Sequence, residues 1–182
     1  MAKSKVRVHG KEFGLLISSE KIQRAIAKIA HRINRDCKNE KPLFIAVLNG
    51  SFLFAADLFK KVNIECEISF IKVASYSGTK SSGNVNKLIG LNENLKGRTL
   101  IILEDIVDSG NTLEKVLAEI KKHKPRKLKT AALFFKPEVY KKKMKLDYIG
   151  MDVPNHFLIG YGLDYDGLGR NFSDIYGLIN NK

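Results

Sequence analysis

The sequence has few cysteines and no long apolar stretch. Cys37 and Cys66, its only two cysteines, form no CxxC pair, and a disulfide framework or a zinc site would need more ligands at closer spacing. We expect both to be buried, reduced thiols. No segment approaches the roughly 18 uncharged apolar residues of a membrane span, and the first residues lack the apolar core of a signal peptide. A cytoplasmic protein with no membrane partner is therefore expected.

Two common nucleotide-binding fingerprints are also missing. Neither GxGxxG, which is typical of dinucleotide binding, nor GxxxxGK[ST], which is typical of triphosphate binding, occurs in the chain. A phosphate-binding function would have to use another loop.

Basic residues are plentiful. The 32 Lys and Arg against 19 Asp and Glu give a formal net charge of +13, which favours anionic partners such as phosphorylated small molecules, nucleic acid or an acidic surface. Much of the excess lies between Lys115 and Lys145. No Phe, Tyr or Trp interrupts its basic runs 121–129 and 141–143 to stack on bases. A solvated face is therefore favoured over a nucleic-acid patch.

The apolar pattern predicts one α/β domain covering residues 1–182. Helical spacing begins at Ser19 and again at about Thr112, and a helix with Phe52, Ala56 and Phe59 inward follows Gly50. Short apolar or alternating runs predict strands at residues 43–48, 64–70, 99–103, 131–135, 149–151 and 157–161.

Alternation of these strands with helices predicts an open, mainly parallel twisted sheet with flanking helices, which binds ligands at the carboxyl ends of its strands. Residues 75–86 have no periodicity and are rich in Ser, Gly, Asn and Lys, so we expect a mobile loop there.

Residues 100–112, LIILEDIVDSGNT, place three acids directly after a buried strand. Glu104 and Asp105 leave this strand at its carboxyl edge. Because adjacent residues of an extended chain point apart, the two carboxylates can grip two vicinal hydroxyls or an associated metal ion. A ribose ring presents such a diol.

Residues 108–112 open the following helix. They supply backbone N–H groups and two hydroxyls at a helix N-terminus, where unpaired donors and the positive end of the dipole hold a phosphate. Gly110 lets the backbone approach closely. A phosphate cradle just beyond a diol grip suits a sugar phosphate, and Asp108 between them would face the anomeric region and act as a base.

Helix capping is the alternative interpretation of these acids. Asp, Ser and Thr are ordinary N-cap residues, and Asp105 or Asp108 alone would be interpreted that way. Three acids together are harder to explain, because crowded anions at one strand end cost stability unless a cation or ligand offsets them. The segment therefore favours a sugar-phosphate site.

This segment resembles the phosphoribosyl pyrophosphate signature of type I phosphoribosyltransferases, and the chain is most similar to the hypoxanthine-guanine members. The resemblance runs from about Leu43 to Arg170 and includes VLNGSFLFAADL, VASYSGTKSSG, LFFKPE and NHFLIGYGLDYDGLGR. It implies a small hood built from the N- and C-terminal segments and a flexible lid loop at about 75–87. It also implies purine salvage by a pentosyltransferase, in which hypoxanthine or guanine and phosphoribosyl pyrophosphate give IMP or GMP and pyrophosphate.

The resemblance also implies roles at the sugar-phosphate end. Asp108 would be catalytic, while Glu104 and Asp105 would hold the ribose diol and its Mg²⁺. The family usually has Lys or Arg in place of Asn49, and many relatives have Lys in place of Asn111, but both loops bind mainly through backbone groups. The 5′-phosphate would contact Ser109, Gly110, Asn111 and Thr112, and pyrophosphate would contact Leu48, Asn49, Gly50 and Arg170.

At the base end, the resemblance implies that Lys136 donates to the 6-oxo group and thereby disfavours adenine. Phe157 would stack on the base while the Leu158 backbone reads its other edge. Asp164 would help bind a second Mg²⁺. Ser75 and Tyr76 would begin the lid. Relatives of this kind are usually homodimers or homotetramers.

Two alternatives remain open at this point. An RNA-binding regulator can share this fold, as some pyrimidine-operon attenuators do, and the +13 charge gives that alternative some weight. The second alternative is a phosphoribosyltransferase that acts on adenine, orotate or uracil. The segments around Lys136 and Phe157 argue against it. We expect a 6-oxopurine enzyme with no nucleic-acid partner, and xanthine stays possible beside hypoxanthine and guanine.

Overall fold

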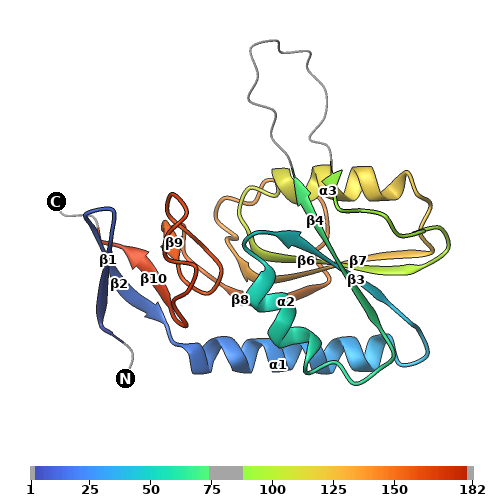
Figure 1. The fold of residues 1–182 in the computed structure, drawn as a ribbon, viewed down its shortest axis with the longest axis horizontal. Coiled ribbons are helices and arrows are strands. Elements are labelled where there is room, and N and C mark those ends of the chain that lie inside the picture. The colour runs from blue at the N-terminus through green and yellow to red at the C-terminus, as the bar shows by residue number, and fades with distance from the viewer. Residues whose placement is uncertain (1–2, 74–87, 180–182) are drawn as a thin grey trace, which may run out of the picture.

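The computed structural model describes residues 3–73 and 88–179. Its main sheet has six strands in the order β5-β4-β3-β6-β7-β8 (Figure 1). All pairs from β4 to β8 are parallel, and β5 is antiparallel to β4 at the edge. The predicted open, mainly parallel sheet is therefore confirmed. The strands are β3 Leu43–Leu48, β4 Glu67–Val73, β5 Leu88–Ile89, β6 Thr99–Val107, β7 Lys127–Phe135 and β8 Tyr148–Asp152.

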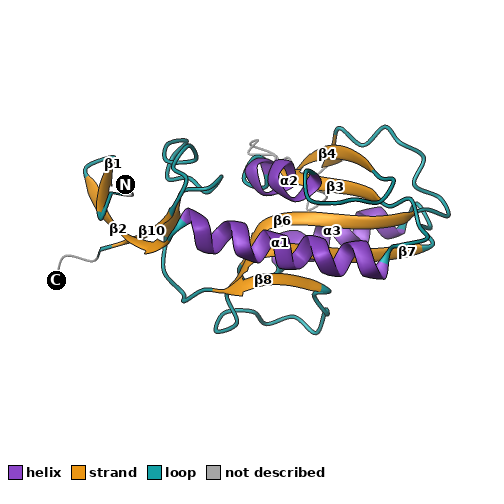
Figure 2. Cartoon of the chain, turned by 90° about the horizontal axis from the view of Figure 1, so that it is seen from below, coloured by secondary structure: helices purple, strands orange, loops and turns teal. Residues whose placement is uncertain are grey.

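Helices cover both faces of this sheet. Helices α1 (Ser19–Asp36) and α2 (Phe52–Phe59) lie on one face and α3 (Asn111–Lys121) on the other (Figures 1 and 2). Because both faces are covered, β3 and the first half of β6 are almost continuously apolar. The helical spacing of α1 and α3 is confirmed by burial of Ile22, Ile26, Ile29, Ile33, Leu113, Val116, Leu117 and Ile120.

The expected hood is a second, antiparallel sheet of four strands beside one end of the main sheet (Figure 1). Its order is β1-β2-β10-β9, so it joins the beginning and the end of the described chain. The sequence pattern does not predict β1, β2 or β10, because these short strands carry charges or glycine and depend on one another for burial. They are β1 Lys5–Val8, β2 Lys11–Ile17, β9 Leu158–Ile159 and β10 Ile175–Leu178.

Asp174 fixes the hood to the start of α1. The backbone N–H of Ser19 donates to Asp174 Oδ1 (2.7 Å), and Asp174 is buried. The N-cap residue Ser18 makes no side-chain capping bond. Asp174 therefore satisfies a helix N-terminal donor from the other end of the chain.

The predicted inward face of α2 is wrong. Phe52 and Ala56 are exposed and Phe59 is half-buried, whereas the buried residues are Phe54, Ala55 and Leu58. Since the helix is apolar almost all round, its periodicity cannot show which side meets the sheet.

The bounds and burial of β4 also differ from expectation. This strand begins at Glu67 instead of near Ile64, Ser69 is buried, and Phe70 is exposed. Strand β7 begins four residues before Ala131. The strand expected at 157–161 is limited to β9 because Gly160 and Tyr161 have positive φ.

Both cysteines are free, and burial raises the pKa of each thiol. Cys37 is buried as expected, but Cys66 is only partly buried. No helix within the described residues has the length and apolarity to cross a membrane. The expected lid loop at about 75–87 lies outside the described residues.

Candidate active site

Strand β6 carries two acids near its carboxyl end. The strand was expected to end at Leu103, but it continues to Val107 because it pairs with β7 beyond the last residue that pairs with β3, so both acids lie within it. Glu104 is 6% exposed, and its Oε1 has no hydrogen-bond partner within the described residues. Burial, together with the charge of Asp105, raises the pKa of Glu104 well above its usual value. Burial also raises the pKa of Asp105 to about 6, although the Ile106 N–H donates to Asp105 Oδ1 (2.9 Å). An unpartnered buried carboxyl oxygen at a strand end indicates a site that a ligand completes.

The loop between β3 and α2 packs directly on Asp105. Ser51 stabilises this loop, because its buried hydroxyl donates to the Val47 carbonyl (2.7 Å). A Cβ added at Gly50 would lie 1.6 Å from Asp105 Oδ2. Only glycine therefore permits this approach of the loop to the carboxylate.

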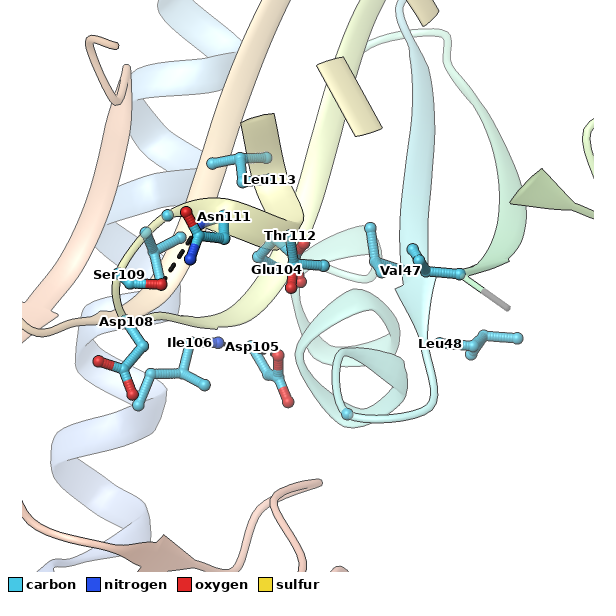
Figure 3. Close-up of a pocket in the computed structure, with 14 residues that line it drawn as sticks. Val47, Leu48, Glu104, Asp105, Ile106, Asp108, Ser109, Asn111, Thr112 and Leu113 are labelled. Atoms are coloured by element: carbon cyan, nitrogen blue, oxygen red, sulfur yellow. Dashed lines mark hydrogen bonds between the residues drawn. The ribbon is translucent and has the colours of Figure 1, made fainter. Parts of the chain in front are cut away.

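A first cavity of about 330 Å³ lies at the N-terminus of α3. It is lined by Glu104, Asp105, Gly50 and residues 108–113. In Figure 3, Ser109, Asn111 and Thr112 cluster at the start of the helix, while Asp105 and Asp108 point away from it. The first-turn N–H groups of a helix have no intrahelical acceptors, so this cavity suits a phosphate.

Tyr140 forms a wall behind the phosphate loop. Gly110 has φ +84°, and a Cβ there would lie 2.6 Å from Tyr140 Cε2. The Tyr140 hydroxyl donates to the Met144 carbonyl (2.6 Å), and its ring meets Phe135 edge-on with centroids 5.1 Å apart. The sequence gives no signal for this contact, which depends on the path of the loop after β7.

A second cavity of about 360 Å³ adjoins the first and shares Gly50, Asp105, Ile106 and Asp108 with it. Lys136 lines it and is almost fully buried. Lys136 Nζ lies 3.1 Å from Asp108 Oδ2. A buried cation and an acid thus meet at the boundary of the two cavities.

The hood supplies an aromatic platform to the second cavity. Phe157 lines the cavity and is 48% exposed. Behind it, the rings of Phe13 and Tyr165 lie at centroid distances of 6.4 and 5.5 Å. A half-exposed ring that is supported from behind can stack on a flat ligand.

Arg170 and Asp164 form an ion pair at the rim of the second cavity. Arg170 Nη2 lies 2.6 Å from Asp164 Oδ1, and Nη1 donates to the Gly162 carbonyl (2.6 Å). Asp164 Oδ2 also accepts from the Gly167 N–H (2.7 Å). In this arrangement Asp164 is committed to protein partners.

Comparison with known proteins identifies the family of this two-part site. The phosphoribosyl transferase domain family matches residues 16–166. This chain belongs to the phosphoribosyltransferase family. A hypoxanthine-guanine phosphoribosyltransferase of Streptococcus pyogenes is 40% identical over 158 residues, which cover 86% of this chain and 88% of that protein. The hypoxanthine phosphoribosyltransferase of Buchnera aphidicola is 37% identical, over 83% of this chain and 87% of its own length.

Solved structures also place this chain in the phosphoribosyltransferase family. The crystal structure of a Bacillus anthracis hypoxanthine-guanine phosphoribosyltransferase superposes with a TM-score of 0.83 at 37% identity, covering 91% of this chain and 98% of that one. A Trypanosoma cruzi hypoxanthine phosphoribosyltransferase gives a TM-score of 0.84 at 33% identity, covering 91% and 95%. The resemblance inferred from the sequence is confirmed.

The phosphoribosyltransferase brings most of its predicted site residues to the two cavities. Leu48 and Ser109 to Thr112 line the first, Lys136, Phe157, Leu158, Asp164 and Arg170 line the second, and Asp105 and Asp108 line both. Asn49 lines neither cavity, and Ser75 and Tyr76 lie outside the described residues. Sequence reasoning missed two apolar residues that line the cavities. Ile106 directly follows Asp105, and Leu163 directly precedes Asp164.

Proposed function

We propose that the protein joins hypoxanthine or guanine to the ribose phosphate of phosphoribosyl pyrophosphate, giving IMP or GMP and pyrophosphate. The observation that carries the proposal is the shared boundary of the two cavities at Asp105 and Asp108. One cavity suits a phosphate and the other a flat base, so a nucleotide spans both with its sugar at the boundary.

The sugar phosphate occupies the first cavity. Backbone N–H groups at 109–112 bind the 5′-phosphate, and Glu104 and Asp105 hold the ribose diol. The unpartnered Oε1 of Glu104 supports this role, because a hydroxyl donor from the sugar would satisfy it.

Mg²⁺ fits the same carboxylates. Their oxygens are the hard ligands that Mg²⁺ prefers, and Mg²⁺ commonly takes only one or two carboxylates and completes its shell with substrate oxygens and water. No group of three His, Cys, Asp or Glu side chains within the described residues is arranged to hold a metal, so the substrate and water would have to supply the other ligands. When bound, the ion neutralises charge on the leaving pyrophosphate. Participation of Asp164 in a second Mg²⁺ site would require Arg170 to release it.

The base occupies the second cavity between Phe157 and the walls formed by Ile106 and Leu163. Lys136 donates to the 6-oxo group of the base. Adenine carries an amino group at this position, so the buried ammonium would face another donor and would lose its hydrogen bond. The Leu158 backbone contacts the other edge of the base. This arrangement selects 6-oxopurines.

The reaction is a displacement at the anomeric carbon. Asp108 lies between the base and the sugar and accepts the proton that the purine nitrogen loses as the new C–N bond forms. Arg170 stabilises the departing pyrophosphate with its forked donors. We further propose that the chain is a single cytoplasmic domain that assembles as a homodimer or homotetramer.

Nucleotide formation tests the proposal. Purified protein is incubated with phosphoribosyl pyrophosphate, Mg²⁺ and either hypoxanthine, guanine, xanthine or adenine, in parallel with Asp108→Asn. We expect turnover of the oxopurines, none of adenine, and severe slowing by the substitution. If no base reacts and the protein instead shifts RNA in a salt-dependent manner at low concentration, the RNA-binding alternative replaces the enzyme.

A further inference from the structure

A tight turn after β9 reaches from the hood to the loop that contains Gly50. Gly160 and Leu163 exchange two backbone hydrogen bonds (3.0 and 2.9 Å). The central residues Tyr161 and Gly162 have φ of +44° and +96°, as in the hairpin turns whose two central residues are both left-handed. Each central residue of this turn makes a separate contact with the β3–α2 unit.

Tyr161 anchors the turn to α2. Its side chain is buried, and its hydroxyl donates to Asp57 Oδ2 (2.5 Å). Gln23 of α1 donates to the same oxygen (2.5 Å), and Lys60 pairs with Asp57 Oδ1 (2.7 Å). Burial and the Asp57 carboxylate raise the pKa of Tyr161, so the hydroxyl keeps its proton and remains the donor.

Gly162 connects the same turn to Gly50 and to Arg170, which are both candidates for binding pyrophosphate. A Cβ at Gly162 would lie 2.0 Å from the Gly50 carbonyl oxygen, so the two backbones are in direct contact. The Gly162 carbonyl accepts from Arg170 Nη1 (2.6 Å), and the Gly162 N–H donates to the Arg170 carbonyl (3.0 Å). The position of Arg170 relative to Gly50 is therefore set through the turn.

We propose that Tyr161 and Asp57 are positioning residues for the pyrophosphate end of the site. Neither residue lines either cavity. Their hydrogen bond holds the turn on α2, which keeps Arg170 beside the Gly50 loop. This inference rests on the proposed function, because that function assigns Arg170 and the loop to pyrophosphate. Lys136 and Phe157 lie outside this turn, and only Leu163 of the turn lines the second cavity. We therefore expect base binding to depend much less on the Tyr161 hydroxyl than pyrophosphate binding does.

Tyr161→Phe removes only the hydroxyl and is the variant that tests the inference. Tyr176→Phe is the matched control, because Tyr176 is a buried hood tyrosine whose hydroxyl donates to Asp174 (3.4 Å). We expect Tyr161→Phe to raise both the KM for phosphoribosyl pyrophosphate and the calorimetric Kd for Mg²⁺-pyrophosphate about tenfold, because displaced binding groups readily lose this much. The KM for hypoxanthine should stay within about twofold of the parent, and Tyr176→Phe should leave all three constants unchanged.

Asp57→Asn provides a second variant in case Tyr161→Phe does not fold. The amide oxygen still accepts from Tyr161, so the effect on pyrophosphate should be in the same direction but smaller. Unchanged pyrophosphate affinity in the folded variants, or an equal rise in the KM for hypoxanthine, would overturn the inference. Because pyrophosphate binding is measured without turnover, a parent that binds pyrophosphate but forms no nucleotide contradicts the proposed function alone. A parent that binds no pyrophosphate contradicts both.

Discussion

Lys136 and Asp108 form an ion pair at the boundary between the two cavities, with 3.1 Å between Nζ and Oδ2. The Lys136 side chain is 9% exposed and the Asp108 side chain is 54% exposed. Asp108 thus compensates the buried ammonium while remaining open to the cavity. Since an ammonium has three N–H donors, Lys136 can keep this bond and still donate to the 6-oxo group of a base.

Replacement of Lys136 by Met tests this arrangement. It removes the donor and the charge but keeps the length of the side chain. We expect kcat/KM for hypoxanthine to fall about 10- to 100-fold, as for a lost bond to a charged donor, and the preference for hypoxanthine over adenine to shrink. Steady-state kinetics with both bases measures this, and Lys141→Met, at an exposed lysine in the same loop between β7 and β8, is the control. A retained base preference would show that Lys136 does not read the 6-oxo group.

Gly50→Ala tests the contact between the pyrophosphate loop and Asp105. The added Cβ would lie 1.6 Å from Asp105 Oδ2, so either the loop or the carboxylate must move. We expect the KM for phosphoribosyl pyrophosphate to rise about tenfold or more, since misplaced binding groups lose this much readily. Gly177→Ala has its nearest atoms at 3.8 Å and should behave like the parent. Equal kinetics of the two variants would show that the approach of Gly50 is unimportant.

Phe157→Ala tests the stacking platform. Base stacking on an aromatic ring contributes about 1–3 kcal/mol, so the KM for hypoxanthine should rise roughly tenfold while the KM for phosphoribosyl pyrophosphate changes little. Phe70→Ala is a suitable control, because Phe70 is similarly exposed, at 42% against 48%, and lines neither cavity. An identical effect of both substitutions on hypoxanthine would contradict the stacking role.

Glu40 gives a pH-dependent prediction away from the site. Its carboxylate, 12% exposed, accepts from Lys127 and from the Thr99 hydroxyl (2.5 Å), and Arg126 lies 3.5 Å away. The Lys127 bond, followed by the Thr99 bond, lowers the pKa of Glu40 below its usual 4.5. A carboxylate with a lowered folded-state pKa stabilises the protein above its unfolded-state pKa, and this contribution is lost as pH falls through the folded-state value.

Glu40→Gln should therefore lower the free energy of unfolding by about 2 kcal/mol near pH 7. The difference from the parent should shrink as pH falls below 4.5 and through the lowered pKa. Urea unfolding near pH 7 and near pH 3 measures both values, with the exposed ion-pair variant Glu65→Gln as a control that should change little. A difference that does not depend on pH would show that packing, and not the carboxylate charge, is responsible.

The sequence predicted the elements whose signal is local. The isoleucines of α1 and the apolar runs of β3 and β6 bury as their periodicity indicates. The segment from Glu104 to Thr112 was recognisable because strand, acids and helix N-terminus are contiguous. Its placement at the carboxyl end of a central parallel strand follows from the α/β order alone.

Features that depend on contacts between distant segments were not predictable. The inward face of α2 is set by the sheet beneath it, because nearly every side chain of that helix is apolar. Strands β1 and β10 exist because they pair with β2. The contacts of Tyr140 with Gly110 and of Tyr161 with Asp57 join residues 30 and 104 positions apart, and no local pattern reports them.

A crystal structure of the protein with bound GMP would test the central claim most directly. We predict that the phosphate lies on the backbone N–H groups of residues 109–112. The ribose should contact Glu104 and Asp105, and the guanine should stack on Phe157 with its 6-oxo group at Lys136. If the nucleotide instead bound elsewhere, or if its phosphate occupied the first cavity while the base lay away from Lys136 and Phe157, the two cavities would not be one phosphoribosyl-transfer site.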